Sequence, residues 1–315
     1  EDPQLSNFLG QVLPFLKKGI PVNTVHIENL NFPATLKDTK ILLMSYSNMK
    51  PLDSNAHHLL AQWVQSGGII VYSGKDNDPY QTVSEWWNTG KYHYASPSEH
   101  LFNLMNISDS KNKNGIFKYG KGSVYIIRED PKSYVMSADG DQSYVGIVSN
   151  LYKQSFHKEI QFKNYYTLKR GPYLMISVLD ENESKTPYTA KGKFIDLFDP
   201  KLPIINSKEV LPDNQSLLFD IDAIQNKKQA QVLASASRIY DEKTSSNTYE
   251  FIAKSPINTI NVMRVLLPQK LKKCTATKTN GSTVEDLQWN WDEMSKTTFV
   301  SFANDPQGIK VRLEW

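Results

Sequence analysis

The pattern of predicted secondary structure changes near residue 150, and this change limits the possible folds of the chain more than any other feature. Before that point, apolar segments with helical spacing alternate with short apolar runs that predict strands, which is typical of a parallel α/β sheet. After Ser155 almost every segment predicts a short strand, and proline, glycine and asparagine separate the strands. Two differently built regions are therefore expected within the 315 residues.

The first region predicts helices and strands in alternation. Helices are expected at 5–18, 54–66, 82–87 and 98–105, strands at 22–27, 40–46 and 68–73, and a hairpin at 115–129. The helix at 5–18 has no strand before it. We therefore expect the first strand of the sheet to lie upstream of Glu1 or to come from elsewhere.

The second region predicts the many short strands of antiparallel β-sandwiches. They are expected at 156–162, 165–168, 173–179, 194–198, 204–211, 216–221, 231–240, 248–253, 259–266, 272–277, 286–291, 297–302 and 310–314. One large sandwich or two small ones would accommodate them, and Ser255-Pro256 is the expected boundary in the second case. The predicted domains are an α/β domain at 1–150, a β-sandwich at 151–254 and a C-terminal β domain at 255–315.

Charge and composition narrow the possible partners. The 36 basic and 33 acidic residues give a net charge of +3, and the lysine doublets are scattered, so a nucleic-acid partner is not expected. No apolar run reaches the ~20 residues of a membrane-spanning helix, so no transmembrane segment is predicted. Cys274 is the only cysteine, which excludes an internal disulfide. The aromatic content of 11% favours an extracytoplasmic location, periplasmic or secreted, with carbohydrate nearby.

Polar and aromatic residues cluster just after the strand expected at 68–73. Ligands of parallel α/β sheets bind beside the carboxyl ends of the strands, where this cluster falls. Tryptophan rings can stack on the apolar face of a sugar while carboxylates accept hydrogen bonds from its hydroxyl groups. Alternatively, Trp86 or Trp87 fills the boundary with the second region and the acids cap the helix expected at 82–87. This alternative is favoured because two adjacent residues of a helix face different sides, so both tryptophans cannot line one ligand site. The predicted ligand-binding residues are Asp76, Asp78, Tyr80, Glu85, Trp86 and Trp87.

The catalytic motifs are incomplete. Ser73 ends a strand as a nucleophilic serine does in a G-x-S-x-G turn, but Val71 and Lys75 stand where that strained turn needs small residues. Asp76 and Asp78 could act as an acid pair with a water between them if the loop brings them together. These three residues are the catalytic candidates.

No cofactor or metal site is predicted. Residues 115–121 have the spacing of a phosphate-binding loop, but a strand follows instead of a helix, so a hairpin turn is favoured. The stretch 139–141 could begin a calcium loop but lacks the later glutamate. His57 and His58 are helical neighbours that point in different directions. Trp289 and Trp291 share one face of a strand, either as a carbohydrate platform or, more simply, in the core.

Four segments of the first region carry a family resemblance. They are LKKGIPV at 16–22, ILLM at 41–44, LAQWVQSGGIIV at 60–71 and YGKGSVY at 119–125. Together they resemble the class I glutamine amidotransferase-like domain found inside family 42 β-galactosidases and related glycoside hydrolases. The resemblance covers roughly the first 130 residues. It implies a flavodoxin-like parallel sheet domain, here followed by one or two antiparallel β-sandwich domains.

The resemblance also implies a role. Amidotransferases place a nucleophilic cysteine directly after the strand that corresponds to 69–72, where this chain has Ser73 and Gly74, so amidotransferase activity is not expected. In the β-galactosidases this domain serves assembly and shapes the mouth of a separate catalytic barrel. The expected function is that of a non-catalytic part of a glycoside-hydrolase-like protein, serving glycan binding, domain support or homo-oligomer formation. The alternative is a hydrolase or esterase whose site lies in the loop 73–87.

Overall fold

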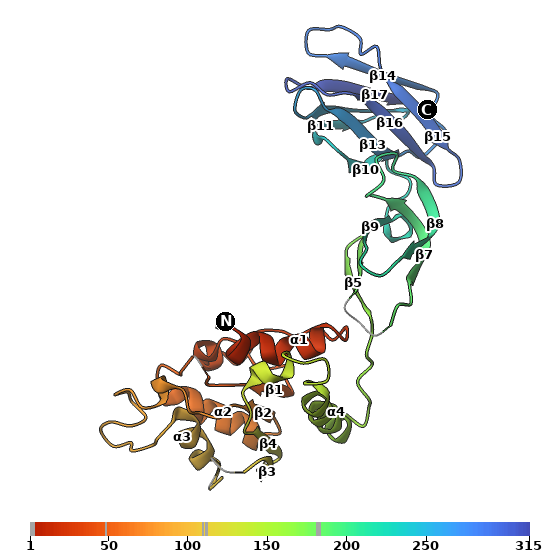
Figure 1. Cartoon of the computed structure of the whole chain (residues 1–315). Helices are drawn as coiled ribbons and strands as arrows, with labels where there is room; N and C mark the ends of the chain where they lie inside the picture. The colour runs from red at the N-terminus through yellow and green to blue at the C-terminus, as the bar shows by residue number, and fades with distance from the viewer. Residues whose placement is uncertain (1–3, 48, 109, 111–112, 181–183) are drawn as a thin grey trace. The chain divides into compact units, whose positions relative to one another are not determined.

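The chain forms two compact units, Glu1–Lys163 and Asn164–Trp315. The computed structural model describes residues 4–47, 49–108, 110, 113–180 and 184–315. Antiparallel sheets make up most of the regular structure, and helices are concentrated in the first unit (Figure 1). The predicted β-rich character of the second region is therefore confirmed. None of the helices in the described residues is long and apolar enough to cross a bilayer.

The first unit contains a mixed four-stranded sheet. Its order is β1 (Ile41–Met44), β2 (Ile69–Ser73), β4 (Gly122–Ile127) and β3 (Gly115–Tyr119). β2 pairs in parallel with both β1 and β4, whereas β3 is antiparallel to β4. Every residue of β2 is buried, as expected for a central strand covered on both faces.

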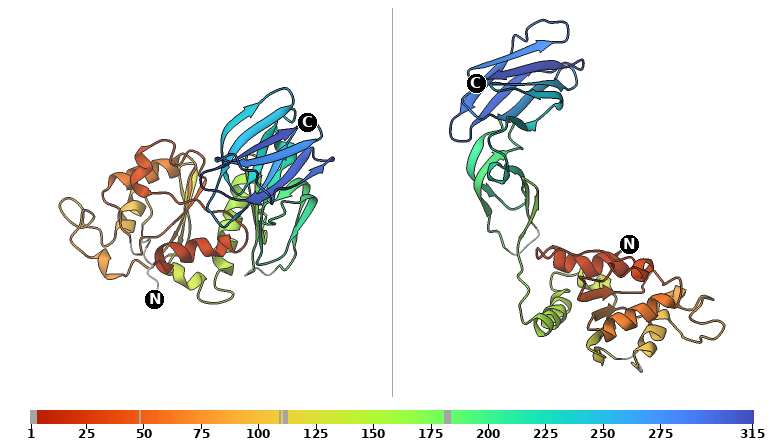
Figure 2. Two further views of the ribbon diagram at one scale, coloured as in Figure 1. Left: turned by 90° about the horizontal axis from the view of Figure 1, so that it is seen from above. Right: turned by 180° about the vertical axis from the view of Figure 1, so that it is seen from behind.

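Helices cover both faces of this sheet (Figure 2). Ile69 and Val71 of β2 pack with α1 (Gly10–Leu16) and α4 (Gln142–Phe156), whereas Ile70 and Tyr72 pack with α2 (Asn55–Gln65) and α3 (Pro97–Leu104). This division follows from the alternation of side chains along a strand. A π-helical turn, η1 (Leu5–Leu9), leads into α1, and together the two elements correspond to the helix predicted at 5–18.

Three predicted elements of this unit are wrong. Residues 20–26 run without regular structure into the 3₁₀ turn η2 (Ile27–Asn31), although Val22 and Val25 still pack against the two cores, so apolar content alone did not make a strand. Residues 82–87 form bends and turns after η3 (Pro79–Gln81) instead of a helix. Here the side chain of Asn88 bonds to the backbone of Val83 and Glu85, replacing helical hydrogen bonds.

The third wrong element is the strand predicted at 156–162. Its first residue is the last of α4, which was not predicted, and His157 then ends that helix in the left-handed conformation with a φ of 53°. Residues 157–163 have no regular structure. The buried side chains of α4 recur with helical spacing, a signal present in the sequence, at Tyr144, Val145, Val148 and Leu151.

The hairpin predicted at 115–129 is confirmed. β3 and β4 pair in register around a turn at Gly120 and Lys121. Gly120 has a φ of 58°, and a Cβ atom there would lie 2.5 Å from the carbonyl oxygen of Gln65. Only glycine fits this turn against the end of α2. The following short turn is η5 (Pro131–Tyr134).

The second unit contains three antiparallel sheets. The first has five strands in the order β5 (Tyr165–Arg170), β6 (Tyr173–Val178), β9 (Gln215–Asp220), β7 (Tyr188–Asp196) and β8 (Ile204–Val210), and η6 (Ile221–Ala223) follows it. The other two sheets have four strands each and enclose a common apolar core. Their orders are β10 (Gln231–Ser235), β13 (Ile260–Leu266), β16 (Thr297–Ala303), β15 (Gln288–Asp292), and β11 (Arg238–Thr244), β12 (Thr248–Lys254), β17 (Ile309–Glu314), β14 (Lys273–Lys278).

Most of the strands predicted for this unit are present. The single strand predicted at 231–240 is instead β10 and β11, which lie in different sheets of the sandwich. Ser255-Pro256 lies between β12 and β13, so the chain crosses there from one sheet of the sandwich to the other. Trp315 is buried in the sandwich core and Trp291 packs against it, whereas Trp289 on the edge strand β15 is 39% exposed.

Candidate functional site

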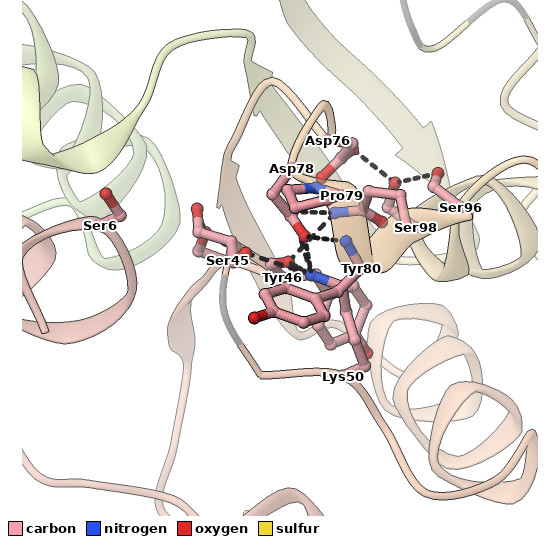
Figure 3. A network of polar contacts seen from close by, with 12 residues as sticks. Ser6, Ser45, Tyr46, Lys50, Asp76, Asp78, Pro79, Tyr80, Ser96 and Ser98 are labelled. Atoms are coloured by element: carbon pink, nitrogen blue, oxygen red, sulfur yellow. Dashed lines mark hydrogen bonds and ion pairs between the residues drawn. The ribbon is translucent and has the colours of Figure 1, made fainter. Parts of the chain in front are cut away.

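Asp76 lies just beyond β2 and joins several buried polar groups. Figure 3 shows its contact with Ser98. Tyr72 Oη donates a hydrogen bond to its Oδ1 and Ser98 Oγ donates one to its Oδ2, each over 2.5 Å. The guanidinium of Arg128 donates to the same carboxylate and to the carbonyl oxygen of Gly74. The side chains of Asp76 and Arg128 are only 3% and 10% exposed. The carboxylate therefore ties the ends of β2 and β4 to α3.

The burial of Tyr72 and the neighbouring charge of Asp76 raise the pKa of the Tyr72 phenol well above its usual value. The phenol consequently keeps its proton and remains a hydrogen-bond donor to Asp76. Asp76 itself has a φ of 53°, in the left-handed region that aspartate tolerates better than most residues. This network fixes a tight bend at the end of the central strand.

Asp78 is neutralised by a second cation. Lys50 Nζ lies 3.1 and 3.0 Å from its two carboxylate oxygens, and Gln81 Nε2 donates to the carboxylate as well. The same ammonium donates to the carbonyl oxygen of Tyr46, which follows β1. Asp78 also caps the turn η3 by accepting a hydrogen bond from the backbone N–H of Tyr80 over 3.1 Å. The two acids predicted as a pair are thus held by different cations.

Ser73 is the last residue of β2, and its side chain is completely buried. Tyr134 Oη donates a hydrogen bond to Ser73 Oγ over 3.0 Å. The ring of Tyr134 stacks on that of Tyr144 with 4.3 Å between centroids, and burial raises the pKa of the Tyr134 phenol. The partner of the Ser73 hydroxyl is therefore a protonated phenol, which cannot accept the serine proton as a general base would.

The two tryptophans of the predicted ligand region lie in different environments. Trp87 is 1% exposed, and its indole N–H donates to the carbonyl oxygen of Gln81 over 2.9 Å. Trp86 is half-buried and donates to the carbonyl oxygen of Pro51 over 2.8 Å. Tyr80, 59% exposed, and Glu85 are open to solvent. Of the six predicted ligand-binding residues, Tyr80 and Glu85 are therefore exposed, Trp86 and Asp78 are partly exposed, and Trp87 is covered.

A buried chain of Tyr46, His57 and His100 lies next to this region and was not predicted. Tyr46 Oη is 2.7 Å from His57 Nε2, and His57 Nδ1 is 2.8 Å from His100 Nδ1. One of the two facing Nδ1 atoms must donate and the other accept, so protonating both would bring two N–H groups together. Trp86 packs edge-on against both imidazoles, with ring centroids 5.3 and 5.1 Å away.

The environment of these histidines favours their neutral forms. Burial lowers the pKa of His57 well below its usual value, and His100 and His58 lower it further. Burial, with His58 and Lys91, lowers the pKa of His100 to about 4. The sequence does contain a signal for His57, because it shares the buried stripe of α2 with Leu60 and Val64 at helical spacing.

Within the described residues, no three His, Cys, Asp or Glu side chains are placed to hold a metal ion. Asp141, part of the incomplete calcium motif at 139–141, is buried and pairs with Lys17 at 3.0 Å. The free thiol of Cys274 is buried in the sandwich, which raises its pKa to about 12.

No family model and no curated protein matches the chain. Solved structures that resemble parts of it include glycoside hydrolases. A β-galactosidase from Bacillus circulans sp. alkalophilus is 13% identical with a TM-score of 0.38, over 67% of this chain and 37% of that one. The chain thus spans little more than a third of that enzyme's length.

Two other glycoside hydrolases show weaker likeness. The catalytic module of a family 98 enzyme from Streptococcus pneumoniae TIGR4 is 10% identical with a TM-score of 0.17, over 70% of this chain and 37% of that one. A family 31 dextranase from Flavobacterium johnsoniae, solved with glucose, is 11% identical with a TM-score of 0.21, over 84% of this chain and 38% of that one.

Proposed function

We propose that this chain is a non-catalytic, ancillary part of a glycoside-hydrolase-like protein. Its first unit would be the flavodoxin-like, amidotransferase-like domain that the sequence resembles, and its role would be to support neighbouring domains and to contact glycan. The observation that carries the proposal is the internal pairing of the charged groups at the strand ends. The two aspartates that follow β2 are held by cations of the same unit, Asp76 by Arg128 and Asp78 by Lys50.

Pairing of this kind suits a supporting role better than catalysis. A catalytic carboxylate must reach a substrate atom within hydrogen-bond distance. The oxygens of Asp76 are occupied by three donors of the chain itself, and the carboxylate is buried. The buried hydroxyl of Ser73 is likewise engaged with Tyr134. A hydrolase or esterase centred on residues 73–87 would need these groups to be released.

The architecture of the first unit is in keeping with the proposed domain. The longest of the four resembling segments, residues 60–71, forms the end of α2 and most of the central strand β2. The glycine-flanked segment 119–125 forms the turn and strand of the hairpin. Homo-oligomer formation and an extracytoplasmic location remain part of the proposal, the latter on the aromatic content of 11%.

An activity screen tests the proposal directly. The full chain would be incubated with aryl glycosides, aryl esters and natural polysaccharides, beside Ser73→Ala and Asp76→Asn. We expect product formation no greater than in a protein-free control for all three proteins. Turnover by the unmodified chain that disappears in either variant would overturn the proposal and establish a hydrolase at the strand ends.

A further inference from the structure

One end of the C-terminal sandwich carries an open hollow of about 380 Å³. Three loops line it, namely the segment before β10, the turn between β11 and β12, and the segment after β13, and Trp315 joins them. The volume lies within the range of about 300–1,000 Å³ that small-ligand sites in proteins occupy. The sequence did not predict this site, because its lining residues are far apart along the chain.

The lining of the hollow is suited to a ligand rich in hydroxyl groups. Its lining includes the amides of Asn226, Gln229 and Gln269 and the hydroxyl of Ser245. Pro268 contributes apolar surface beside Trp315, which is only 5% exposed. Amides and hydroxyls both donate and accept hydrogen bonds, as sugar hydroxyls do. A lining of mostly neutral polar groups with a smaller apolar part suits the many hydroxyl groups of a saccharide.

Lys228 adds one positive charge to this neutral lining. The neighbouring Lys227 pairs with Asp222 at 2.7 Å. For Lys228, by contrast, no carboxylate among the described residues lies within ion-pair distance of the ammonium group. A cation without an acidic partner, set among neutral donors and acceptors, favours an anionic group on the ligand.

Hydrogen bonds within the loops hold the rim in place. The backbone N–H of Lys228 donates to Asn226 Oδ1, and Gln231 Nε2 donates to the Asn226 carbonyl oxygen, both over 3.2 Å. In the turn between β11 and β12, the Ser245 N–H donates to the Thr248 carbonyl oxygen over 2.9 Å. A rim that is ordered before binding loses less conformational entropy when the ligand arrives.

We propose that this hollow binds an acidic oligosaccharide, with a uronic acid carboxylate against Lys228 and sugar hydroxyls bonded to the rim amides. The inference rests on the proposed ancillary function and names the substrate class that the chain would contact. It locates glycan contact in the second unit, at residues separate from the predicted region 73–87.

Calorimetric titration of the full chain tests the inference. The ligands would be trimers of galacturonate, glucuronate and mannuronate, with galactotriose as the neutral comparison and sodium sulfate as a simple anion. We expect saturable binding of at least one uronate trimer and at least about tenfold weaker binding of galactotriose, since a charge-assisted hydrogen bond is lost.

Two lysine variants provide the matched comparison. Lys228→Gln should weaken binding of the uronate trimer at least about tenfold, whereas Lys227→Gln, next to it in sequence, should bind within about twofold of the unmodified chain. Gln269→Ala should weaken binding severalfold while leaving the sulfate titration unchanged.

Each contrary result has a distinct meaning. Absence of binding by all three uronates, or equal binding by Lys228→Gln and Lys227→Gln, would overturn the inference and leave the ancillary function standing. Sulfate binding as tight as that of the uronates would overturn it as well, because the site would then recognise a bare anion. Shorter saccharides in the titrated samples, detected by chromatography, would instead overturn the non-catalytic function.

Discussion

Two regions of this molecule both bring charged groups and tryptophan together, and they differ in how the charged groups are paired. In the strand-end region of the first unit, residues 73–87, Asp76 and Asp78 pair with cations of the same unit and Trp87 is 1% exposed. In the sandwich hollow of the second unit, amides and hydroxyls line open space and Lys228 has no acidic partner in the described residues. Residue types that suggest a ligand site are informative only once their partners are known.

The largest effect is expected from Trp87→Ala. Removing a fully buried indole should lower the free energy of unfolding of the first unit by about 4 kcal/mol, through lost burial and the cavity left behind. Urea denaturation with hydrogen exchange of the β2 amides would measure the loss in this unit alone. Trp289→Ala, at a site 39% exposed, should destabilise the second unit by less than half as much.

These two variants can also contradict the assignment of a structural role to the strand-end region and of ligand binding to the hollow. If Trp87→Ala kept its stability but abolished saccharide binding, the strand-end region would be a ligand site after all, as the sequence suggested. Retained binding together with lost stability would support the division of roles between the two regions.

Arg128→Met should have the next largest effect. The substitution leaves the carboxylate of Asp76 buried without its cation, which we expect to lower the free energy of unfolding by about 3 kcal/mol. Asp76→Asn in the same chain should restore part of the loss, because the uncompensated charge is removed. Both are measured by urea denaturation.

The exposed pair of Lys153 and Glu159 provides the control, since Lys153→Met should leave stability unchanged. Equal effects of Arg128→Met and Lys153→Met would show that the strand-end charges are not needed to hold this region together.

Acid should destabilise the first unit through its buried histidines. Their pKa values are lower in the folded chain than in the unfolded chain, so the unfolded chain binds more protons as the pH falls below about 6.5. His100, with a pKa of about 4, should remove about 2 kcal/mol of the free energy of unfolding by pH 5 relative to pH 8. Stability should be fully present above pH 6.5 and decline between about pH 6.5 and 4.

Urea denaturation at a series of pH values would measure this decline. His100→Gln should flatten it between pH 6.5 and 5, whereas substitution of the exposed His93 by glutamine should not. A decline that is identical in both variants would place the acid sensitivity elsewhere.

Local sequence patterns predicted the elements whose formation depends on residues close together in the chain. The α2 stripe, the wholly apolar β2, the glycine turn at Gly120 and most strands of the second unit could be read from periodicity and turn residues. The strand predicted at 22–27 is absent, although Val22 and Val25 pack against the cores. Apolar residues are buried in strands and in irregular segments alike, so their presence did not distinguish a strand from an irregular segment.

The partners in the candidate site could not be predicted in the same way. Lys50 and Asp78 are 28 positions apart, His57 and His100 are 43 apart, and Arg128 is 52 from Asp76. Such pairs are set by the order of strands and the packing of helices, which local periodicity does not specify. The sequence therefore predicted that Asp76 and Asp78 follow a strand, but it did not predict that Arg128 and Lys50 pair with them.

The smallest effect is expected from Ser96→Ala at the start of α3. Ser96 Oγ accepts a hydrogen bond from the Glu99 N–H over 3.3 Å, as an N-cap residue does, so its loss should cost about 1 kcal/mol. The same helix carries Ser98, a donor to Asp76, and His100, so loosening its first turn should raise hydrogen exchange there before exchange in β2 changes. Ser84→Ala, at an exposed site, is the matched control. If the exchange of β2 rose as much as that of α3, the strand-end network would depend on the helix cap and would not be held mainly by its own ion pairs.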